Sequence, residues 1–477
     1  MNTKLLRQKI LDLAIRGKLT DQRKSDGTAR ELLEQITASR QPERSTKSAK
    51  SKDPTPIIPL NKSEAPFEIP NSWEWIKLGD VGNWQSGTTP SKSNLDYYRN
   101  GTIPWLNTGD LNDGIVSQIP KMVTEKALKE TSLRMNDAGS VCIAMYGATI
   151  GKLGILPIPA TTNQACCVCN KQANFVERMW LFYFLMFHKQ EFIEAGFGGA
   201  QPNISKEKIV STAFPLPPLT EQQRIIAKIE EAFAEIDAVE KNKELLKTHI
   251  KQTRQKILDL AIHGKLVPQD ENDEPASVLL EKILQEKAQT DNKKSPKKKK
   301  TADIVTSDNR PYEKIDCIVE TETSIPSKWT SCFLGDVISV INGKNQSAVE
   351  NSNGLYPIYG SGGKMGRAND FLCPENCTII GRKGSINNPI FVPEKFWNVD
   401  TAFGLCPSRA ILAKYLFFFC LYFDFSSLDS STTLPSLTKT NIQQIKIVLP
   451  PLAEQKRIVD KVEDLFKSLD EISFHLV

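Results

Sequence analysis

The sequence repeats itself, and this internal duplication constrains the fold more than any other feature. The segment RQKILDLAIRGKL beginning at Arg7 returns as RQKILDLAIHGKL beginning at Arg254. LPPLTEQQRIIAKIEEAFAEID from Leu216 returns as LPPLAEQKRIVDKVEDLFKSLD from Leu449. Because a duplicated order of segments indicates a duplicated order of structural elements, the chain is expected to contain two related units.

Further repeated residues lie between these helix-like segments. An IPxxW motif followed by LGDV occurs around Trp73 and again around Trp329, and a glycine follows each copy at Gly87 and Gly343. A weaker alignment pairs Ile143, Gly147, Asn163 and Ala165 with Ile380, Gly384, Asp400 and Ala402. The second copy lies 256 residues after the first at the tryptophans and 233 residues after it at the helix-start motif, so the second module is shorter by 23 residues.

The order of the repeated segments is cyclic. The chain opens with the segment that ends its central part and closes with the segment that begins it. Each complete unit is therefore a globular module followed by a long helix, and the second unit's helix is divided between the two chain ends. This order predicts a pseudo-twofold arrangement in which the termini meet.

Apolar residues recur in alternating steps of four and three from Ile225 to Leu260, and only Lys243 and Thr253 break the pattern. This 3.5-residue period predicts a coiled-coil helix about 50 Å long. One such stripe is also typical of ordinary core packing, but matching stripes at the two chain ends favour an intramolecular antiparallel pair. The predicted coiled-coil positions are Ile225, Ile229, Ile236, Val239, Leu246, Ile250, Ile257, Leu260, Leu6, Ile10, Leu13, Ile458, Val462, Leu465, Leu469 and Ile472.

Composition places the chain among soluble proteins of mixed structure. Apolar residues make up 40% and charged residues 25% of its 477 residues, and the net charge is +5. The longest apolar runs, Leu181–Phe187 and Tyr415–Phe423, are much shorter than the roughly 20 residues that cross a bilayer, so they predict buried helices. The first residues do not resemble a signal peptide. We therefore expect a cytoplasmic location and no membrane partner.

The ten cysteines predict no metal site. The densest group, Cys166, Cys167 and Cys169, lies in an apolar stretch typical of a strand, and no second CxxC pair accompanies it. Cys373 and Cys377 are interpreted as loop or core thiols. In a cytoplasmic chain all ten are expected to be reduced.

No segment carries a recognisable catalytic motif. GATIGK at Gly147–Lys152 is one residue short of a phosphate-binding loop, and Leu153 stands where Ser or Thr would bind magnesium. The four histidines are scattered and form no HExxH motif. No catalytic residue is therefore predicted.

The paired blocks IPxxWxxxxLGDV, AIxGKL and LPPLxEQxRI, each present twice in cyclic order, resemble the specificity subunit (S subunit) of type I restriction-modification systems. The resemblance implies an α+β chain with two globular α/β target recognition domains, separated by a long antiparallel two-helix coiled coil. It implies that the domains read the halves of a bipartite, asymmetric site in double-stranded DNA, and that two modification (methyltransferase) subunits and two restriction subunits are partners. The chain itself would be non-catalytic and hold no cofactor, since S-adenosylmethionine, ATP and magnesium belong to the partner subunits.

The repeats and the resemblance together predict the following domain boundaries. The segments are an N-terminal helix at 1–38, a linker at 39–66, the first recognition domain at 67–214, a central helix at 215–284, a Lys-rich linker at 285–324, the second recognition domain at 325–448 and a C-terminal helix at 449–477.

Candidate DNA contacts lie in glycine-rich loops, which bring polar and basic side chains close to base edges and phosphates. The residues predicted in the first module are Gly87, Thr88, Thr89, Ser91, Tyr146, Gly147, Thr149, Lys152, Gly199, Gln201 and Asn203. Those predicted in the second are Gly343, Lys344, Asn345, Gln346, Arg382, Lys383, Ser385, Thr433, Ser436 and Thr438. Ordinary turns use the same residue types, so each position is also compatible with a purely structural role. Trp73 and Trp329 are interpreted as core anchors.

Two other functions remain open at this stage. The repeated modules are compatible with a protein-binding coiled-coil scaffold, which would show no DNA sequence preference. A nuclease with an unrecognised acidic metal site is also compatible, and it would cleave DNA in the presence of magnesium.

Overall fold

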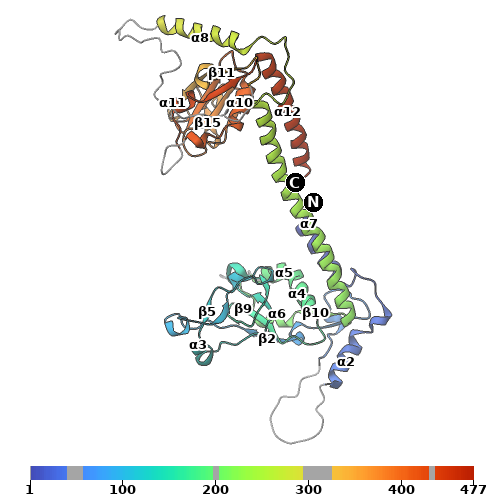
Figure 1. Cartoon of the computed structure of the whole chain (residues 1–477). Helices are drawn as coiled ribbons and strands as arrows, with labels where there is room; N and C mark the ends of the chain where they lie inside the picture. Colours follow the sequence, from blue (N-terminus) through green and yellow to red (C-terminus); the bar gives the residue numbers. More distant parts are fainter. Residues whose placement is uncertain (1, 40–56, 197–202, 294–324, 429–435, 477) are drawn as a thin grey trace. The chain divides into compact units, whose positions relative to one another are not determined.

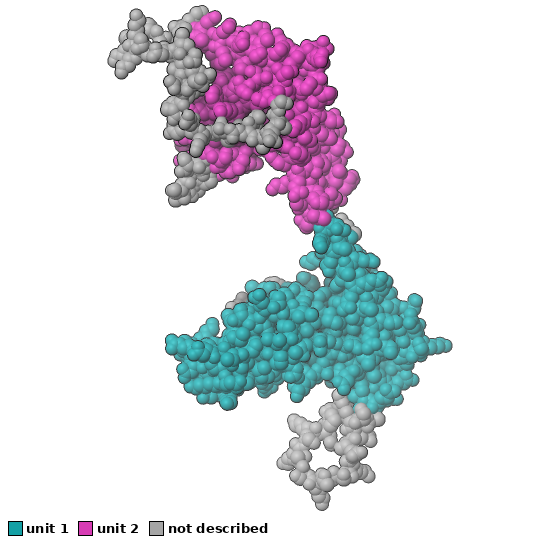
Figure 2. Space-filling model, viewed as in Figure 1, with its two compact units in different colours: residues 1–242 teal, residues 243–477 magenta. Residues whose placement is uncertain are grey.

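Helix α7 is the longest element of the computed structural model and runs from Leu219 to Ile262. Its 44 residues extend about 66 Å at 1.5 Å per residue. The structure describes residues 2–39, 57–196, 203–293, 325–428 and 436–476. They form two compact units, 1–242 and 243–477, so the unit boundary falls inside α7 (Figure 2).

The described residues of unit 1 form six further α-helices and ten short strands. The helices are α1 (Thr3–Ile15), α2 (Ala29–Ser39), α3 (Glu125–Glu130), α4 (Arg178–Phe187), α5 (Lys189–Gly196) and α6 (Lys206–Ser211). The strands are β1 (Glu74–Lys77), β2 (Asn83–Ser86), β3 (Ile103–Leu106), β4 (Gly114–Ile115), β5 (Met122–Val123), β6 (Val141–Ala144), β7 (Leu153–Ile155), β8 (Thr161–Thr162), β9 (Cys166–Asn170) and β10 (Ala213–Leu216).

Unit 2 repeats most of these elements in the same order, although its described residues contain no counterpart of α3. Its helices besides α7 are α8 (Ala276–Lys293), α9 (Leu334–Val337), α10 (Ala413–Tyr422), α11 (Lys439–Gln443) and α12 (Leu452–Phe474). Its strands are β11 (Thr330–Phe333), β12 (Ile338–Asn342), β13 (Tyr356–Gly360), β14 (Gly363–Ala368), β15 (Cys377–Gly381), β16 (Ile390–Val392), β17 (Trp397–Asn398), β18 (Ala402–Pro407) and β19 (Lys446–Leu449).

The sheets of the two units have the same topology. Unit 1 has the strand orders β2-β9-β6-β7-β4, β5-β3-β8 and β1-β10, and unit 2 has β12-β18-β15-β16, β14-β13-β17 and β11-β19. The second strand of each three-stranded sheet is antiparallel to one neighbour and parallel to the other. Among the strands of the described residues, only β4, which pairs in parallel with β7, has no counterpart in unit 2.

The central strands of both large sheets are buried on two faces. In β9, Cys167 and Cys169 pack into the core that contains α4 and α7, whereas Cys166 and Val168 pack into a second core on the other face. Strands β15 and β18 divide their side chains between two cores in the same way. Because side chains alternate across a strand, a continuous apolar run indicates this two-sided burial. Burial raises the pKa of the Cys167 thiol to about 12, so it packs as a neutral side chain.

The apolar runs of the sequence form the buried helices that were predicted. Leu181–Phe187 lies in α4 and Tyr415–Phe423 covers α10 and its C-cap. Trp180 and Tyr415 are among the largest fully buried side chains of the described residues. No helix in the described part of the chain is both long enough and apolar enough to cross a bilayer.

The difference in module length lies mainly in two connections. The one from β5 to β6, residues 124–140, contains α3 and is nine residues longer than residues 369–376 between β14 and β15, and the one from β3 to β5 differs by more. Fifteen residues, 107–121, join β3 to β5 and contain β4, whereas only Ser361 and Gly362 join the equivalent strands β13 and β14. Leu111 and Val116 of the longer connection are buried against the unit 1 sheet. The extra residues therefore widen the sheet and its second core.

Two predicted segments have a different internal structure from the one expected. The central segment 215–284 is not one helix, because α7 ends at Ile262 and α8 begins at Ala276. Helix α8 also extends into the predicted linker at 285–324, and the structure describes that linker only up to residue 293. Gly264 has a φ of 66°, a left-handed conformation that suits the end of α7.

Candidate nucleic-acid interface

A loop in each unit leaves the first strand of the large sheet through a glycine. A Cβ on Gly87 would lie 2.2 Å from the carbonyl oxygen of Asn163, and one on Gly343 would lie 1.7 Å from that of Val399. Only glycine fits at these two positions, since the backbone of the neighbouring loop approaches too closely for a side chain. Both glycines therefore have a packing role between loops, and the predicted DNA contact at these two positions stays a prediction.

Residues from three predicted loops of unit 1 meet around Gln164. The Thr89 hydroxyl donates to Oε1 of Gln164, and the Tyr146 hydroxyl donates to the Gln164 carbonyl at 2.5 Å. Asn203 pairs with Tyr146 as an isolated β-bridge. Gly147 beside this bridge is exposed and has a φ of 76°. The predicted loops thus form one surface rather than three separate turns.

Other predicted contacts of unit 1 have local roles or lie elsewhere. The Thr149 hydroxyl donates to the Tyr146 carbonyl at 3.5 Å, and the Ser91 hydroxyl lies 2.8 Å from that of Ser93. Lys152 is half-buried directly before β7. Two predicted positions, Gly199 and Gln201, lie outside the described residues.

Unit 2 brings its predicted loops together with the same backbone contacts. The Arg382 N–H donates to the Thr401 carbonyl at 2.8 Å, and Lys383 pairs with Ser436 as an isolated β-bridge. The Lys344 N–H donates to Asn398 at 3.0 Å. The equivalent bonds in unit 1 are Met145 to Ala165 at 2.8 Å, Tyr146 with Asn203, and Thr88 to Thr162 at 2.9 Å.

These bonds correct the alignment of the repeats by one residue. Ala165 is equivalent to Thr401, not to Ala402 as the sequence alignment had it. Gln164 is therefore the counterpart of Asp400. The sequence alignment was wrong here because the stretch from Gly147 to Ala165 is one residue longer than the stretch from Gly384 to Thr401. The loops in these stretches share too few identical residues to indicate where a gap belongs.

The remaining predicted residues of unit 2 lie around the same surface. The Asn345 side chain accepts from the Ser347 N–H at 2.8 Å, and the Gln346 carbonyl accepts from the Val349 N–H at 2.9 Å. Thr438 caps α11, and Ser385 is exposed beside Gly384. Thr433 lies outside the described residues.

The two loop surfaces differ in charge. In unit 2 the exposed or half-buried cations Lys344, Arg382 and Lys383 share the surface with the β13–β14 hairpin, because Ser361 Oγ lies 4.0 Å from a Cβ built on Gly384. That hairpin adds Lys364, which is exposed. The matching positions of the first three cations in unit 1 are Thr88, Met145 and Tyr146, which carry no charge at neutral pH. A positive loop surface suits phosphate or guanine contacts.

Sequence reasoning missed Gln164, Asp400 and Lys364. The first two precede an apolar strand without a glycine-rich motif, and the third follows a short hairpin turn that has no counterpart of equal length. A search for repeated positions occupied by different polar residues would have found Gln164 and Asp400, provided that the gap was placed correctly.

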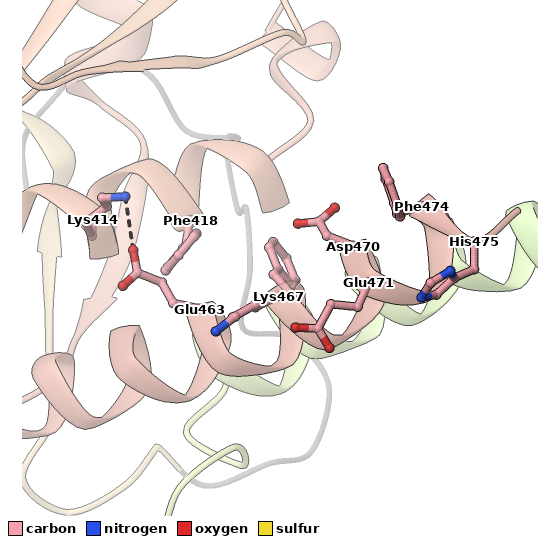
Figure 3. Close-up of a pocket in the computed structure, with 9 residues that line it drawn as sticks. Lys414, Phe418, Glu463, Lys467, Asp470, Glu471, Phe474 and His475 are labelled. Carbon is pink, nitrogen blue, oxygen red and sulfur yellow. Dashed lines mark ion pairs between the residues drawn. The ribbon is translucent and has the colours of Figure 1, made fainter. Parts of the chain in front are cut away.

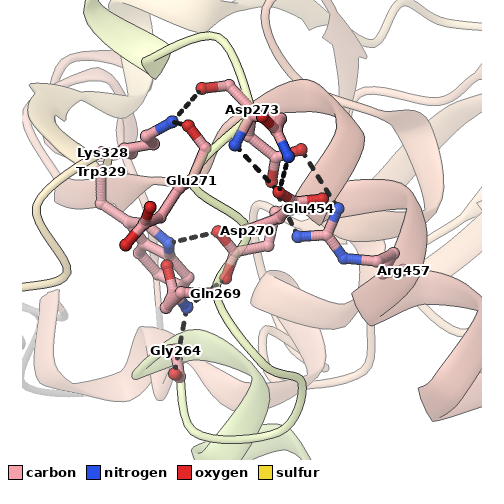
Figure 4. Close-up of polar contacts among 10 residues, drawn as sticks. Gly264, Gln269, Asp270, Glu271, Asp273, Lys328, Trp329, Glu454 and Arg457 are labelled. Carbon is pink, nitrogen blue, oxygen red and sulfur yellow. Dashed lines mark hydrogen bonds and ion pairs between the residues drawn. The ribbon is translucent and has the colours of Figure 1, made fainter.

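A buried polar junction connects each module to its long helix, and Figure 4 shows the junction of unit 2. In unit 2, Glu454 is fully buried and accepts hydrogen bonds from Trp329 Nε1 at 2.9 Å and Gln269 Nε2 at 2.6 Å. Arg457 forms an ion pair with Asp273 at 2.7 Å. These contacts join the start of α12, the tryptophan of the IPxxW motif and the segment that follows α7.

Unit 1 forms the same junction from the equivalent residues. Glu221 accepts from Trp73 Nε1 at 2.9 Å and from Gln22 Nε2 at 2.5 Å, and Arg224 pairs with Asp26. Burial raises the pKa of Glu221, and it raises that of Glu454 in the same way. The junction explains the repeated LPPLxEQxRI and IPxxW motifs and confirms that both tryptophans are core residues.

Each unit also pairs α7 with a second helix that runs in the opposite direction. In unit 1, Arg7 of α1 lies 2.6 Å from the Asp237 carboxylate and 5.0 Å from the Phe233 ring centroid. In unit 2, where α12 lies alongside α7 (Figure 1), the matching contacts join Arg254 to Asp470 at 2.5 Å and to Phe466 at 4.6 Å. These contacts link residues that the sequence repeat had already aligned.

The predicted coiled-coil positions differ in burial. Those with exposed fractions below 9% are Ile225, Ile229, Ile236, Ile250, Ile257, Ile458 and Val462. Ile10, Leu13, Leu260, Leu465 and Leu469 are half-buried. Leu6, Val239, Leu246 and Ile472 are 38–45% exposed, because they lie near the free ends of the paired helices within their own units.

A groove lies between α10 and α12 in unit 2 (Figure 3). Lys414 and Glu463 form an ion pair of 3.0 Å across it, and the rings of Phe418 and Phe466 lie 5.9 Å apart at its base. Phe474 at its end is 78% exposed. Within the described part of the chain, no group of three or more His, Cys, Asp and Glu side chains is placed to hold a metal ion.

Comparison with family models identifies two matching segments. The model described as "Type I restriction modification DNA specificity domain" matches residues 70–248 and 326–474, which together exceed half of the chain. The two segments coincide with the repeated modules and the helices that follow them.

Curated relatives and solved structures agree with this match. The specificity subunits of the type I restriction enzymes EcoAI and EcoEI from Escherichia coli are each 24% identical to this chain, over 99% of it and 90% of their own lengths. The HsdS subunit from Thermoanaerobacter tengcongensis superposes with a TM-score of 0.52 at 17% identity, over 87% of this chain and 94% of its own. A chain from a structure of a type I R-M system, titled for complex assembly and conformational transition, gives a TM-score of 0.58 at 18% identity, over 86% and 94%.

Proposed function

The chain belongs to the type I restriction-modification DNA specificity family, and we propose that each of its two units reads one half of a bipartite, asymmetric DNA sequence. The proposed recognition domains are residues 67–214 and 325–448. In this role the chain selects the site, and it performs no chemical step itself. Its curated relatives are likewise named as specificity subunits.

One observation carries the proposal: the two units present different side chains on matching loop backbones. Thr88, Met145 and Tyr146 of unit 1 make the same main-chain contacts as Lys344, Arg382 and Lys383 of unit 2. Since base readout depends on side-chain donors and acceptors, one framework with two sets of side chains is suited to reading two different half-sites.

We further propose that the helices act as a spacer between the readers. Helices α1, α7 and α12, which lie in the segments 1–38, 215–284 and 449–477, would form an antiparallel two-helix coiled coil, with linkers at 39–66 and 285–324. Support comes from the matched contacts of Arg7 and Arg254 within their own units. A stiff spacer suits two half-sites on the same face of the duplex, because half-sites one helical turn apart are separated by about 34 Å.

The proposed partners are two modification subunits and two restriction subunits, which would hold S-adenosylmethionine, ATP and magnesium. Exposed apolar residues on the paired helices, such as Leu6 in unit 1 and Ile472 in unit 2, offer docking area for such partners. The complex would work in the cytoplasm.

The test is to express the chain together with its modification subunit and to map methylated adenines across a genome. We expect a two-part motif with a fixed gap, and no such motif when the modification subunit is expressed alone. A purified chain that binds partner proteins but shows no DNA sequence preference would instead support a scaffold. Magnesium-dependent cleavage by the isolated chain would support a nuclease.

A further inference from the structure

We propose that Gln164 and Asp400 are base-reading residues at one equivalent position of the two units, with Gln164 selecting adenine and Asp400 selecting cytosine. The inference rests on the proposed function, because it names the contact by which each recognition domain discriminates. Neither residue lies in a glycine-rich motif. Both were located by their hydrogen-bonded neighbours.

The equivalence follows from the backbone on both sides of the position. The carbonyl two residues before Gln164 or Asp400 accepts a hydrogen bond from the loop that follows β2 or β12. The carbonyl one residue after Gln164 or Asp400 accepts a hydrogen bond from the residue that follows β6 or β15. The accepting residues are Thr162 and Ala165 in unit 1, and Asn398 and Thr401 in unit 2. The two side chains therefore leave matching points of the same framework.

The position is also the centre of each loop surface. The Gln164 carbonyl accepts from the Tyr146 hydroxyl at 2.5 Å, and the Asp400 carbonyl accepts from Arg382 Nη1 at 3.4 Å. Both residues are exposed although their main chains are held from two sides. An exposed side chain on a fixed main chain suits discrimination between base edges, because a group on a loosely held backbone can adapt to the wrong base.

The hydrogen bond from Thr89 prepares the Gln164 amide for adenine. The Thr89 hydroxyl donates to Oε1, which leaves the second lone pair of Oε1 and both N–H groups of Nε2 available. An acceptor and a donor side by side complement the N6 amino group and N7 of adenine in the major groove.

The surroundings of Asp400 argue against a phosphate contact and for a base contact. Its carbonyl accepts from the Arg382 side chain, and the main-chain N–H groups of Lys344 and Lys383 donate to the nearby carbonyls of Asn398 and Thr401. Among the described residues, no ion pair joins a cation to the Asp400 carboxylate. An acidic group on a basic surface opposes phosphate binding, and its acceptor-only oxygens match the N4 amino group of cytosine.

The experiment exchanges the two chemistries in the full chain expressed with its modification subunit, and it reads the methylated motif. Gln164→Glu removes the amide donors, so one adenine of one half-site should change to cytosine. Asp400→Asn supplies a donor beside an acceptor, so one cytosine of the other half-site should change to adenine. Each variant should alter discrimination at its position by about 5- to 150-fold and leave the opposite half-site unchanged.

Matched controls carry the same chemical changes at the far ends of the same sheets. The first control is Asn174→Asp, because Asn174 follows the C-terminal end of β9 whereas Gln164 precedes its N-terminal end. The second control is Glu375→Gln, because Glu375 precedes β15 at the end of that strand away from Asp400. Both side chains are exposed, and both variants should keep the wild-type motif.

Several outcomes overturn the inference while the proposed function stands. One is a normal two-part motif that neither Gln164→Glu nor Asp400→Asn alters, and another is an equal alteration by the controls. If a variant complex methylates nothing, its binding to DNA duplexes with single-base substitutions is measured at low salt. Loss of preference at one position supports the inference, and a full wild-type preference overturns it. A wild-type chain without any motif instead defeats the proposed function itself.

Discussion

Around Glu221 and Glu454 the two units join the same residue types at nearly equal distances, whereas around Gln164 and Asp400 they place different side chains on matching backbone. The junction is buried, and the loop surface is open to solvent. A buried polar group must find a partner, so its neighbours cannot change singly. An exposed loop residue has no such restriction, and the two copies of the repeat therefore differ in their side chains there.

The junction tryptophans provide the strongest test of this likeness. Trp73→Ala and Trp329→Ala each remove a buried indole and leave a buried carboxylate without one donor. We expect each change to lower the free energy of unfolding of its own unit by about 3–5 kcal/mol. Hydrogen exchange across a urea series, resolved by peptide, measures the two units separately. Unequal losses would show that the junctions are alike in geometry only.

The junction carboxylates sharpen the comparison through pH. Because burial raises the pKa of Glu221 above its ordinary value of 4.5, the folded unit binds this proton more tightly than the unfolded chain does. The stability contributed by the group is therefore greatest below pH 4.5 and falls as the pH rises through the raised pKa.

Glu221→Gln and Glu454→Gln remove this titration. Each should destabilise its unit by about 1–3 kcal/mol, because the new amide presents a donor to a tryptophan or glutamine donor. The loss should be larger at pH 4 than at pH 7 in both units, as measured by the urea midpoint at the two pH values. A pH-independent loss in one unit would break the match between the junctions.

The loop surfaces should differ in their dependence on salt. Arg382→Gln and Lys383→Gln each remove a candidate phosphate contact, so each should flatten the slope of log affinity against log salt by about 0.9. Tyr146→Phe in unit 1 keeps the charge and should leave the slope unchanged. Binding of the complex to its own site between 50 and 200 mM salt checks this, and equal slopes for all three variants would contradict it.

The smallest effect is expected at the helix pairs. Arg7→Lys and Arg254→Lys keep the charge but lose the planar contact with Phe233 and Phe466. Each should lower stability by at most about 1 kcal/mol, because the pairs are partly exposed. Thermal unfolding of the two variants should give nearly equal shifts, and a large shift for only one would set the helix pairs apart.

Much of the fold follows from the sequence because its causes are local. The periodic apolar residues of α7 and the apolar runs of α4 and α10 are patterns within single segments, and they indicate the helices that the structure contains. The glycines at Gly87 and Gly343 reveal close approaches because no other residue fits there. Duplication then extends each local inference to a second place in the chain.

What the sequence did not reveal depends on distant neighbours. Trp73, which donates a hydrogen bond to Glu221, lies 148 residues before it in the sequence. Nothing in the helix-start motif indicates that the Glu221 carboxylate is buried. Strand β4 was missed because two residues give no periodicity, and it forms only beside β7. In the sequence, nothing distinguishes Gln164 from other polar residues that precede a strand. Its place at the site is evident only from the hydrogen bonds that Thr89 and Tyr146 donate to it.

Every hydrogen bond of each junction lies within its own half of the chain, 1–242 or 243–477. A crossover between two related genes near the middle of α7 would thus exchange one unit together with all the hydrogen bonds of its junction. Such a recombinant would inherit two intact interiors from two parents. If each unit reads one half-site, as proposed, the recombinant would recognise a DNA target with one half-site from each parent.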